Sequence, residues 1–121
     1  MITRAAIDDV LRSHAAWKQE LHDAIASQQS DFTVETLKRD DLCELGKWLR
    51  RLTPEDKQGV EIDLILLAHA QFHEAAAEIL ALALEGKTTI ALRLLEFNGT
   101  YGLTSARLTG ALNEWKARLP P

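Results

Sequence analysis

Apolar residues recur at three- and four-residue steps along most of the chain, which is the period of helices that bury one face. The first such segment runs from Thr3 to about Ser27, and Thr3 is a suitable N-cap for it. His14 is the unusual member of its buried stripe, because the other inward positions are apolar. Those inward positions are Ile7, Val10, His14, Trp17, Leu21 and Ala24.

A polar segment, residues 27–31, follows this helix and predicts a loop. Thr33 then favours one short helical turn. A second short helix is predicted from Leu42 to about Leu52, with Asp41 as its N-cap and Glu44 completing a capping box. The middle of the chain is therefore expected to hold short helical pieces between loops.

Two residues of the helix predicted over 42–52 stand out. Gly46 costs about 1 kcal/mol relative to alanine inside a helix, so we expect close packing against another element there. Cys43 falls in the first turn, where free N–H groups and the helix dipole favour a thiolate.

The longest apolar pattern predicts the main helix, from about Val60 to Leu84, with a glycine stop at Gly86. Upstream, residues 53–56 (TPED) combine an N-cap threonine, a proline and two acidic residues, which is the pattern of a helix start. Gly59 is a candidate interruption between that start and the main helix.

A last helix is predicted from Thr88 to Leu119, with a kink or a close helix contact near Asn98, Gly99 and Gly102. The chain has no strand-like alternation and no internal repeat. Long helices joined by short polar connections predict an all-α fold, an antiparallel four-helix bundle with an additional short helix carrying the cysteine. We expect residues 1–121 to form a single domain.

Composition excludes several classes of function. The 14 basic residues are scattered among 18 acidic ones and the net charge is −4, so the basic face of a nucleic-acid-binding protein is not expected. Polar residues interrupt the apolar run 62–84, which argues against a membrane span. The N-terminus lacks the apolar core of a secretory signal, so we expect a cytoplasmic location. A single cysteine excludes an intrachain disulfide.

The candidate chemistry begins with His69 and His73, which lie one helical turn apart on a buried face. Two imidazoles so placed can bind one metal ion at about 2.0–2.1 Å. His14 and Cys43 occupy a buried stripe and a helix start on two other helices. Three imidazoles and one thiolate match the preference of Zn²⁺ and complete a closed tetrahedral shell.

A closed shell leaves no position for a reactive water, so we expect a structural or sensory zinc site and no enzymatic activity. The sequence HAQFH at 69–73 also lacks the glutamate base of the HExxH metalloproteases. The alternative is packing, because a buried histidine is usually hydrogen-bonded and a buried cysteine is usually a small apolar residue. Three buried histidines would each need a separate partner, which favours metal. His22 lies off the stripe and is expected on the surface.

Three motifs occur in order: HAAWK at 14–18, CELGKWL at 43–49 and HAQFH at 69–73. Together they resemble the chemoreceptor zinc-binding (CZB) domain family, whose marks are similar to HxxW[KR], CxxGKWL and HxxFH. The last two motifs are quite specific as a pair. The motifs span His14 to His73, and every motif position matches.

The resemblance implies a helical bundle that holds Zn²⁺ through His14, Cys43, His69 and His73. CZB domains are typically homodimers in the bacterial cytoplasm, attached to chemoreceptors of chemotaxis or to diguanylate cyclases that make cyclic-di-GMP. There they act as regulators: zinc inhibits the cyclase, and oxidants such as hypochlorous acid act on the zinc–cysteine pair. Because this chain starts at Met1, it is expected to be a stand-alone domain or an N-terminal regulatory domain.

The expected function is therefore that of a zinc-binding sensor that detects zinc, oxidants or both and passes a conformational signal to a signalling partner. No nucleic-acid or membrane partner is expected. The alternative is a zinc-stabilised bundle that dimerises or docks a protein without sensing. A weaker third possibility is a metalloenzyme in which Cys43 is displaced and a coordination position opens to water.

Overall fold

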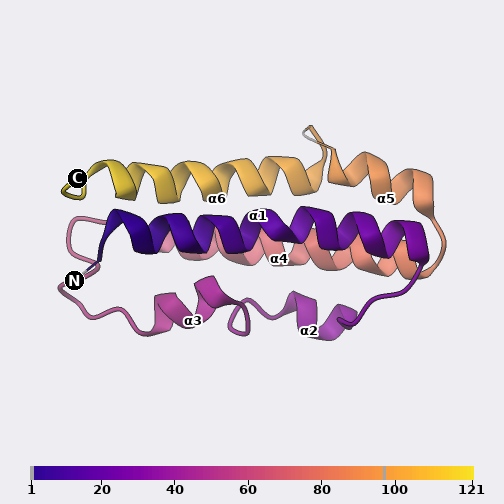
Figure 1. Cartoon of the computed structure of the whole chain (residues 1–121), viewed down its shortest axis with the longest axis horizontal. Coiled ribbons are helices and arrows are strands. Elements are labelled where there is room, and N and C mark those ends of the chain that lie inside the picture. Colours follow the sequence, from indigo (N-terminus) through magenta and orange to yellow (C-terminus); the bar gives the residue numbers. More distant parts are fainter. Residues whose placement is uncertain (1, 97) are drawn as a thin grey trace.

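The computed structural model describes residues 2–96 and 98–121, and all regular structure in them is helical (Figure 1). This confirms the predicted all-α class. The helices are α1 (Arg4–Ser27), α2 (Val34–Lys38), α3 (Glu44–Arg50), α4 (Ile62–Leu84), α5 (Thr88–Leu95) and α6 (Thr100–Ala117).

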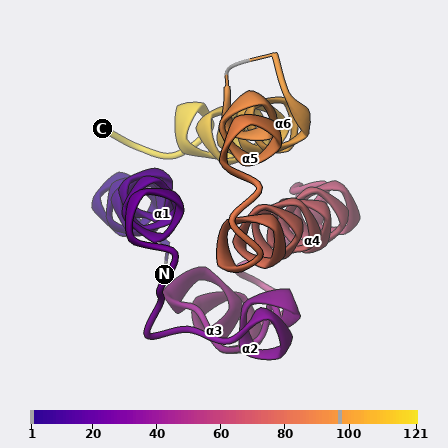
Figure 2. The same ribbon diagram turned by 90° about the vertical axis from the view of Figure 1, so that its right-hand side faces the viewer.

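The helices form four rods that surround a common core (Figures 1 and 2). Helices α1 and α4 each form one rod and run in the same direction. Helices α2 and α3 follow one another along a third rod, and α5 and α6 along a fourth, both in the opposite direction. The specific prediction of an antiparallel four-helix bundle is not confirmed, because two of the four rods are each broken into shorter helices.

Local capping signals determine where the first two helices begin. The Thr3 hydroxyl accepts a hydrogen bond from the Ala6 amide (3.2 Å) at the start of α1. Thr33 does the same for the Thr36 amide (3.0 Å) at the start of α2. The sequence predicted the cap at Thr3 and a short helical turn starting at Thr33. In both places a threonine hydroxyl satisfies an amide that the first helical turn leaves free.

The helix start predicted at residues 53–56 opens no helix, whereas the interruption predicted at Gly59 and the main helix predicted from about Val60 are both present. The amide of Thr53 donates to the Asp56 carboxylate (2.9 Å) and the amide of Asp56 donates to the Thr53 hydroxyl (3.2 Å), so Thr53 caps this turn as predicted. Only turns follow it, because Gly59 adopts a positive φ of 75° that a helix cannot contain. Helix α4 begins at Ile62 and ends, as predicted, before Gly86, whose φ is 77°.

The last predicted helix is broken and not merely kinked. Helix α5 ends at Leu95, and Gly99 is the N-cap of α6. A Cβ atom on Gly99 would lie 2.5 Å from the carbonyl oxygens of both Arg93 and Leu94, so only glycine fits where the chain passes over the end of α5.

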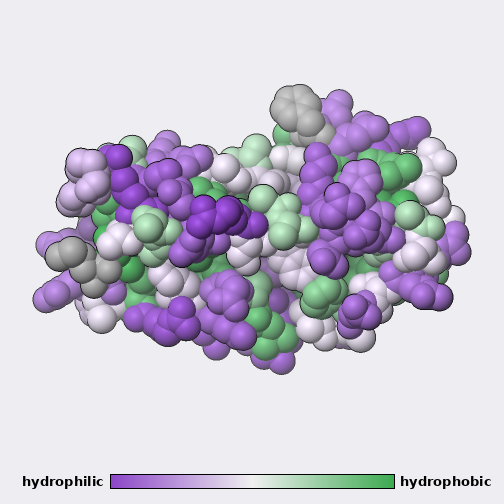
Figure 3. All heavy atoms as spheres, in the orientation of Figure 1, coloured by the Kyte–Doolittle hydropathy of each residue, from purple (hydrophilic) through white to green (hydrophobic). Residues whose placement is uncertain are grey.

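The core follows α4, whose apolar face contacts each of the other three rods. Hydrophobic side chains on the face seen in Figure 3 form small separate patches among hydrophilic ones. None of the helices within residues 2–96 and 98–121 combines the length and apolar character that crossing a membrane requires. The largest fully buried apolar side chains are Phe72, Ile7, Leu21, Leu45, Ile79, Leu80, Leu95, Leu108 and Leu112.

Candidate metal centre

The four residues predicted from the sequence come together in the interior. His14 comes from α1, Cys43 directly precedes α3, and His69 and His73 come from α4. One nitrogen or sulfur atom from each lies within 4.8 Å of the corresponding atoms of the others. Ligand atoms of a tetrahedral zinc shell are about 3.3–3.8 Å apart, given bonds of about 2.0–2.3 Å. Small side-chain adjustments therefore bring these four atoms to that geometry.

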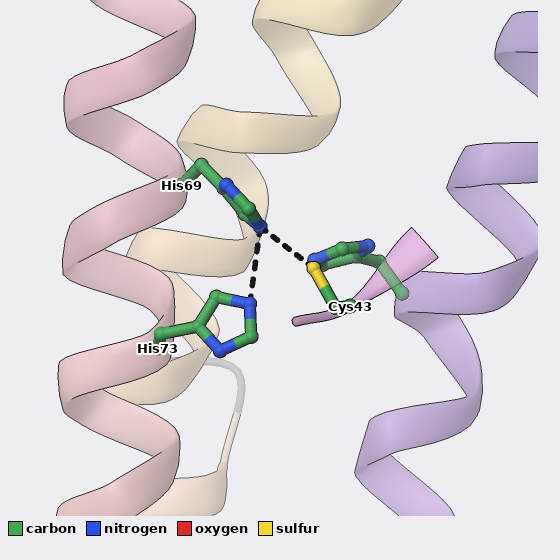
Figure 4. Close-up of side chains that lie close together, drawn as sticks. Cys43, His69 and His73 are labelled. Carbon is green, nitrogen blue, oxygen red and sulfur yellow. Dashed lines mark hydrogen bonds between the residues drawn. The ribbon is translucent and has the colours of Figure 1, made fainter. Parts of the chain in front are cut away.

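His69 lies at the middle of the cluster. Its Nε2 atom is 3.0 Å from Nε2 of His73 and 3.1 Å from Sγ of Cys43. Figure 4 shows the two histidines projecting from one face of α4 toward Cys43. Each of the two is only 1% exposed. The one-turn spacing in the sequence thus places both rings on the same buried face, as expected.

The orientation of His73 is determined by a backbone group. Its Nδ1 atom lies 2.9 Å from the carbonyl oxygen of Leu37, at the end of α2. A carbonyl can only accept, so Nδ1 carries the proton and the lone pair of Nε2 points into the cluster. Hydrogen bonds of this kind orient metal-binding histidines in proteins. Sequence patterns did not indicate this partner, because any residue supplies a backbone carbonyl.

His14 separates the metal hypothesis from the packing hypothesis. Its side chain is buried, and neither ring nitrogen has a hydrogen-bond partner among the described residues. An unsatisfied buried polar group costs about 1–3 kcal/mol. Packing alone would require a partner for each buried histidine. A metal ion in the cluster would satisfy one of the two unpaired ring nitrogens, so the residues present fit a bound metal.

Cys43 has a second role as the N-cap of α3. Its Sγ atom accepts a hydrogen bond from the Gly46 amide (3.3 Å), and its thiol lies 3.8 Å from the Asp40 carbonyl oxygen. A Cβ atom on Gly46 would lie 1.9 Å from that same carbonyl oxygen. The close packing expected at Gly46 is therefore real, and its contact is the loop that precedes the helix.

The predicted capping box at Asp41 is wrong. Helix α3 begins two residues later than expected, at Glu44. The Asp41 carboxylate instead contacts the guanidinium groups of Arg39 (2.6 Å) and Arg50 (3.6 Å). Cys43 therefore lies outside the first turn of α3. It occupies the N-cap, the position whose side chain faces the free amides of the first turn.

The cluster is electrically neutral in the absence of a metal. Burial, reinforced by the nearby His73, lowers the pKa of His14 to about 4, although the backbone of Val10 opposes the shift. Burial likewise lowers the pKa of His69 to about 3 and that of His73 below its usual value. Burial raises the pKa of the Cys43 thiol. All three imidazoles therefore present lone pairs at neutral pH, whereas the thiol must lose its proton when a metal binds.

The donor set indicates which metal fits. Among the described residues, this group of potential ligands contains three imidazole nitrogens and one sulfur, and no carboxylate. Hard cations such as Mg²⁺ and Ca²⁺ need oxygen ligands, whereas Zn²⁺ readily takes nitrogen and sulfur in a closed tetrahedral shell. The chemistry of the cluster therefore favours zinc.

A family model described as the chemoreceptor zinc-binding domain matches residues 14–80, more than half of the chain. The chain belongs to this family. The match begins at His14 and includes the other three residues of the cluster. It identifies the chain as a zinc-binding regulatory domain of the CZB type, with zinc as its cofactor. No curated protein and no solved structure is significantly similar to this chain.

The remaining histidine of the CZB domain is not part of the cluster. His22 is exposed on α1, as the sequence predicted. It provides a matched control for substitutions of the buried histidines, because it is the same residue type on one of the same helices.

The contact between Leu37 and His73 predicts a role for Thr33 in metal binding. Thr33→Ala removes the cap of α2, at a cost of about 1 kcal/mol, and α2 carries the carbonyl that orients His73. We expect zinc affinity to fall up to ~10-fold, the lower end of the effect of losing such a partner. Competition with a chromophoric chelator measures the change.

Thr3→Ala is the control, because Thr3 caps α1 in the same way and takes no part in orienting His73. This variant should lose similar stability and keep its zinc affinity. Equal affinities for the Thr33 and Thr3 variants would show that the α2 carbonyl does not tune the site.

Proposed function

We propose that this CZB domain is a zinc-dependent sensor in which His14, Cys43, His69 and His73 bind one Zn²⁺ ion. The observation that carries the proposal is the buried His14 ring, which has no hydrogen-bond partner among the described residues and lies beside three further donors. A full set of four protein ligands supports a regulatory role and no enzymatic activity, because a substrate or a reactive water would need a free coordination position.

The sensing element in this proposal is the sulfur of Cys43. Bound zinc supplies positive charge that keeps this sulfur as a thiolate. The same sulfur caps α3 by accepting the Gly46 amide (3.3 Å). Cys43 is partly exposed, whereas the three histidines are buried, so it is the ligand that a dissolved oxidant can reach.

Hypochlorous acid is the proposed oxidant. The thiolate of Cys43 attacks chlorine, so that an S–Cl bond forms, the Cl–O bond breaks and hydroxide leaves. Water then displaces chloride and gives the sulfenic acid with release of a proton, and sulfur has lost two electrons to chlorine. The oxidised sulfur is a poorer ligand and a poorer acceptor for the Gly46 amide, so the start of α3 loosens and local order becomes the signal.

The family description supports a signalling partner of the chemoreceptor type, and we extend this proposal to diguanylate cyclases. We also propose that the domain acts in the cytoplasm as a homodimer. Size-exclusion chromatography with light scattering tests the dimer independently of the metal site.

The sensing proposal predicts that hypochlorite releases zinc through Cys43. The purified chain is expected to hold about one zinc ion, in line with one closed four-ligand site, and to release it when hypochlorite is added in equal amount. Cys43→Ala should bind zinc more weakly and release what it holds with no dependence on the oxidant. A chromophoric chelator reports the free metal. Identical release from the wild type and the variant would overturn the role of Cys43.

A rival function is a structural zinc bundle that dimerises or docks a protein without sensing. The almost complete burial of His69 and His73 favours it, since such positions also suit a purely structural site. Circular dichroism of the same samples separates the two functions. If the domain is a sensor, release of zinc should reduce the helical signal only by the amount that one short helix contributes. If it is a structural bundle, the whole domain should unfold when zinc leaves.

A further inference from the structure

Helix α3 is too short to hold its position alone. It has seven residues, and isolated helices below about 12–15 residues are marginal in water. Its place in the fold therefore depends on tertiary contacts: Leu45 and Leu49 are buried in the core, and each end of the helix makes a further contact. One end lies at the metal centre, and the other lies against a residue that takes no part in that centre.

The N-terminal end of α3 is joined to the metal centre by Cys43. The sulfur that lies 3.1 Å from His69 also accepts the amide of Gly46, and the Lys47 amide donates to the Cys43 carbonyl (3.0 Å). Gly46 has no room to shift toward the preceding loop, since even a Cβ atom there would clash with the Asp40 carbonyl oxygen. The sulfur and the first turn of α3 must therefore move together.

The other end of α3 contacts α6 through a pair of tryptophans. The rings of Trp48 and Trp115 lie 5.2 Å apart with a tilt of 42°. Figure 2 shows α3 and α6 on opposite sides of the bundle, with α1 to one side and α4 to the other, so this contact passes between α1 and α4. Trp115 is 3% exposed and belongs to the last turn of α6.

Trp115 lies where the end of α6 is attached to the rest of the bundle. Three residues later, Arg118 donates a hydrogen bond to the Gly59 carbonyl, in the turn before α4. The Arg4 side chain, at the start of α1, donates to the Leu119 carbonyl (3.0 Å). A displacement of Trp115 would therefore also displace the contacts at the end of the bundle where α1 begins and α6 ends (Figure 1).

We infer that the Trp48–Trp115 pair couples the metal centre to this end of the bundle, with α3 as the moving part. Trp115 is accordingly a positioning residue for the metal centre: it holds α3, which holds the Cys43 sulfur. The inference rests on the proposed function in requiring Cys43 to be a zinc ligand. Coupling of this kind is reciprocal, so metal must affect the tryptophan pair and the pair must affect metal affinity equally.

Circular dichroism tests the first direction. Two tilted indoles at this separation couple their transitions and give paired bands of opposite sign, which Trp48→Phe and Trp115→Phe should each abolish and thereby assign. Removing zinc with a chelator should weaken these bands in the wild type. Unchanged bands after the metal has demonstrably left would overturn the inference and leave zinc binding intact. A chain that holds no zinc would instead refute the proposed function.

A double-mutant cycle tests the second direction. Trp115→Leu should weaken zinc binding roughly 2- to 10-fold, the range that loss of one aromatic pair implies. In a Cys43→Ala background the same substitution should change zinc affinity little, because its effect passes through that sulfur. Equal weakening in both backgrounds would show a general packing effect and overturn the inference.

Two further variants keep this cycle interpretable. Trp115→Phe retains an aromatic ring and should fall between Trp115→Leu and the wild type, even if the leucine variant folds poorly. Leu103→Ala alters an exposed side chain on the same helix and should leave zinc affinity unchanged.

Discussion

Replacing His69 by alanine is expected to lower zinc affinity by on the order of 100-fold or more. Structural zinc sites are worth about 10–16 kcal/mol, so one of four ligands accounts for roughly 3 kcal/mol, or more than two powers of ten. His69 also holds the centre of the cluster, since its Nε2 atom lies within 3.1 Å of both Cys43 and His73. Competition with a chromophoric chelator provides the measurement.

His22→Ala is the control for this loss. His22 is exposed on α1, so its replacement should change neither the affinity nor the number of zinc ions bound. Comparable zinc affinity in the His69 and His22 variants would mean that the buried cluster is not the metal site, and the proposed function would fail with it.

Replacing Gly46 by alanine is expected to destabilise the domain by about 3 kcal/mol, the upper part of the usual range for overpacking. The added Cβ would lie 1.9 Å from the Asp40 carbonyl oxygen, which is a backbone atom and cannot rotate away. Relief requires the loop before α3 to move, and that loop leads directly into Cys43. Zinc affinity should therefore fall together with the denaturation midpoint in urea.

Replacing Gly110 on α6 by alanine is expected to stabilise the domain, in contrast to the same replacement at Gly46. A Cβ atom there meets no described atom within 4 Å, and alanine costs less backbone entropy than glycine in a helix. This variant should gain about 0.5–1 kcal/mol and bind zinc as the wild type does. If Gly46→Ala were equally well tolerated, the packing between the loop and α3 would be looser than the structure shows.

Short-range signals accounted for the helix ends that depend only on neighbouring residues. Thr3 and Thr33 each cap the helix that was predicted to follow, because hydroxyl and amide lie within one turn. The TPED segment also forms its local pair and yet no helix follows, since the backbone at Gly59 turns away. The break at Gly99 depends on its close approach to the carbonyl oxygens of Arg93 and Leu94 at the end of α5, where the sequence pattern predicted only a kink or a close helix contact.

The side chains that form the candidate site could be predicted from the sequence, but the way they lie relative to one another could not. The helical period placed His69 and His73 on one face of their helix. The apolar stripe of the first helix predicted that His14 also faces the interior.

The sequence indicated Asp41 as the N-cap of the short helix and placed Cys43 in its first turn, whereas Cys43 is the N-cap in the structure. Asp41 pairs with Arg39 and Arg50. The Cys43 sulfur lies 3.1 Å from Nε2 of His69, a residue of another helix that no local pattern places there.

The unequal lengths of the helices that carry the ligands have a consequence for how fast metal exchanges. His69 and His73 lie in the middle of the 23-residue α4, whose opening would require unfolding of the whole core. Cys43 precedes a seven-residue helix, and short segments open at far lower free-energy cost than global unfolding. The residence time of zinc should therefore follow the opening rate around α3, so the domain can release its ion on a timescale much shorter than its own unfolding.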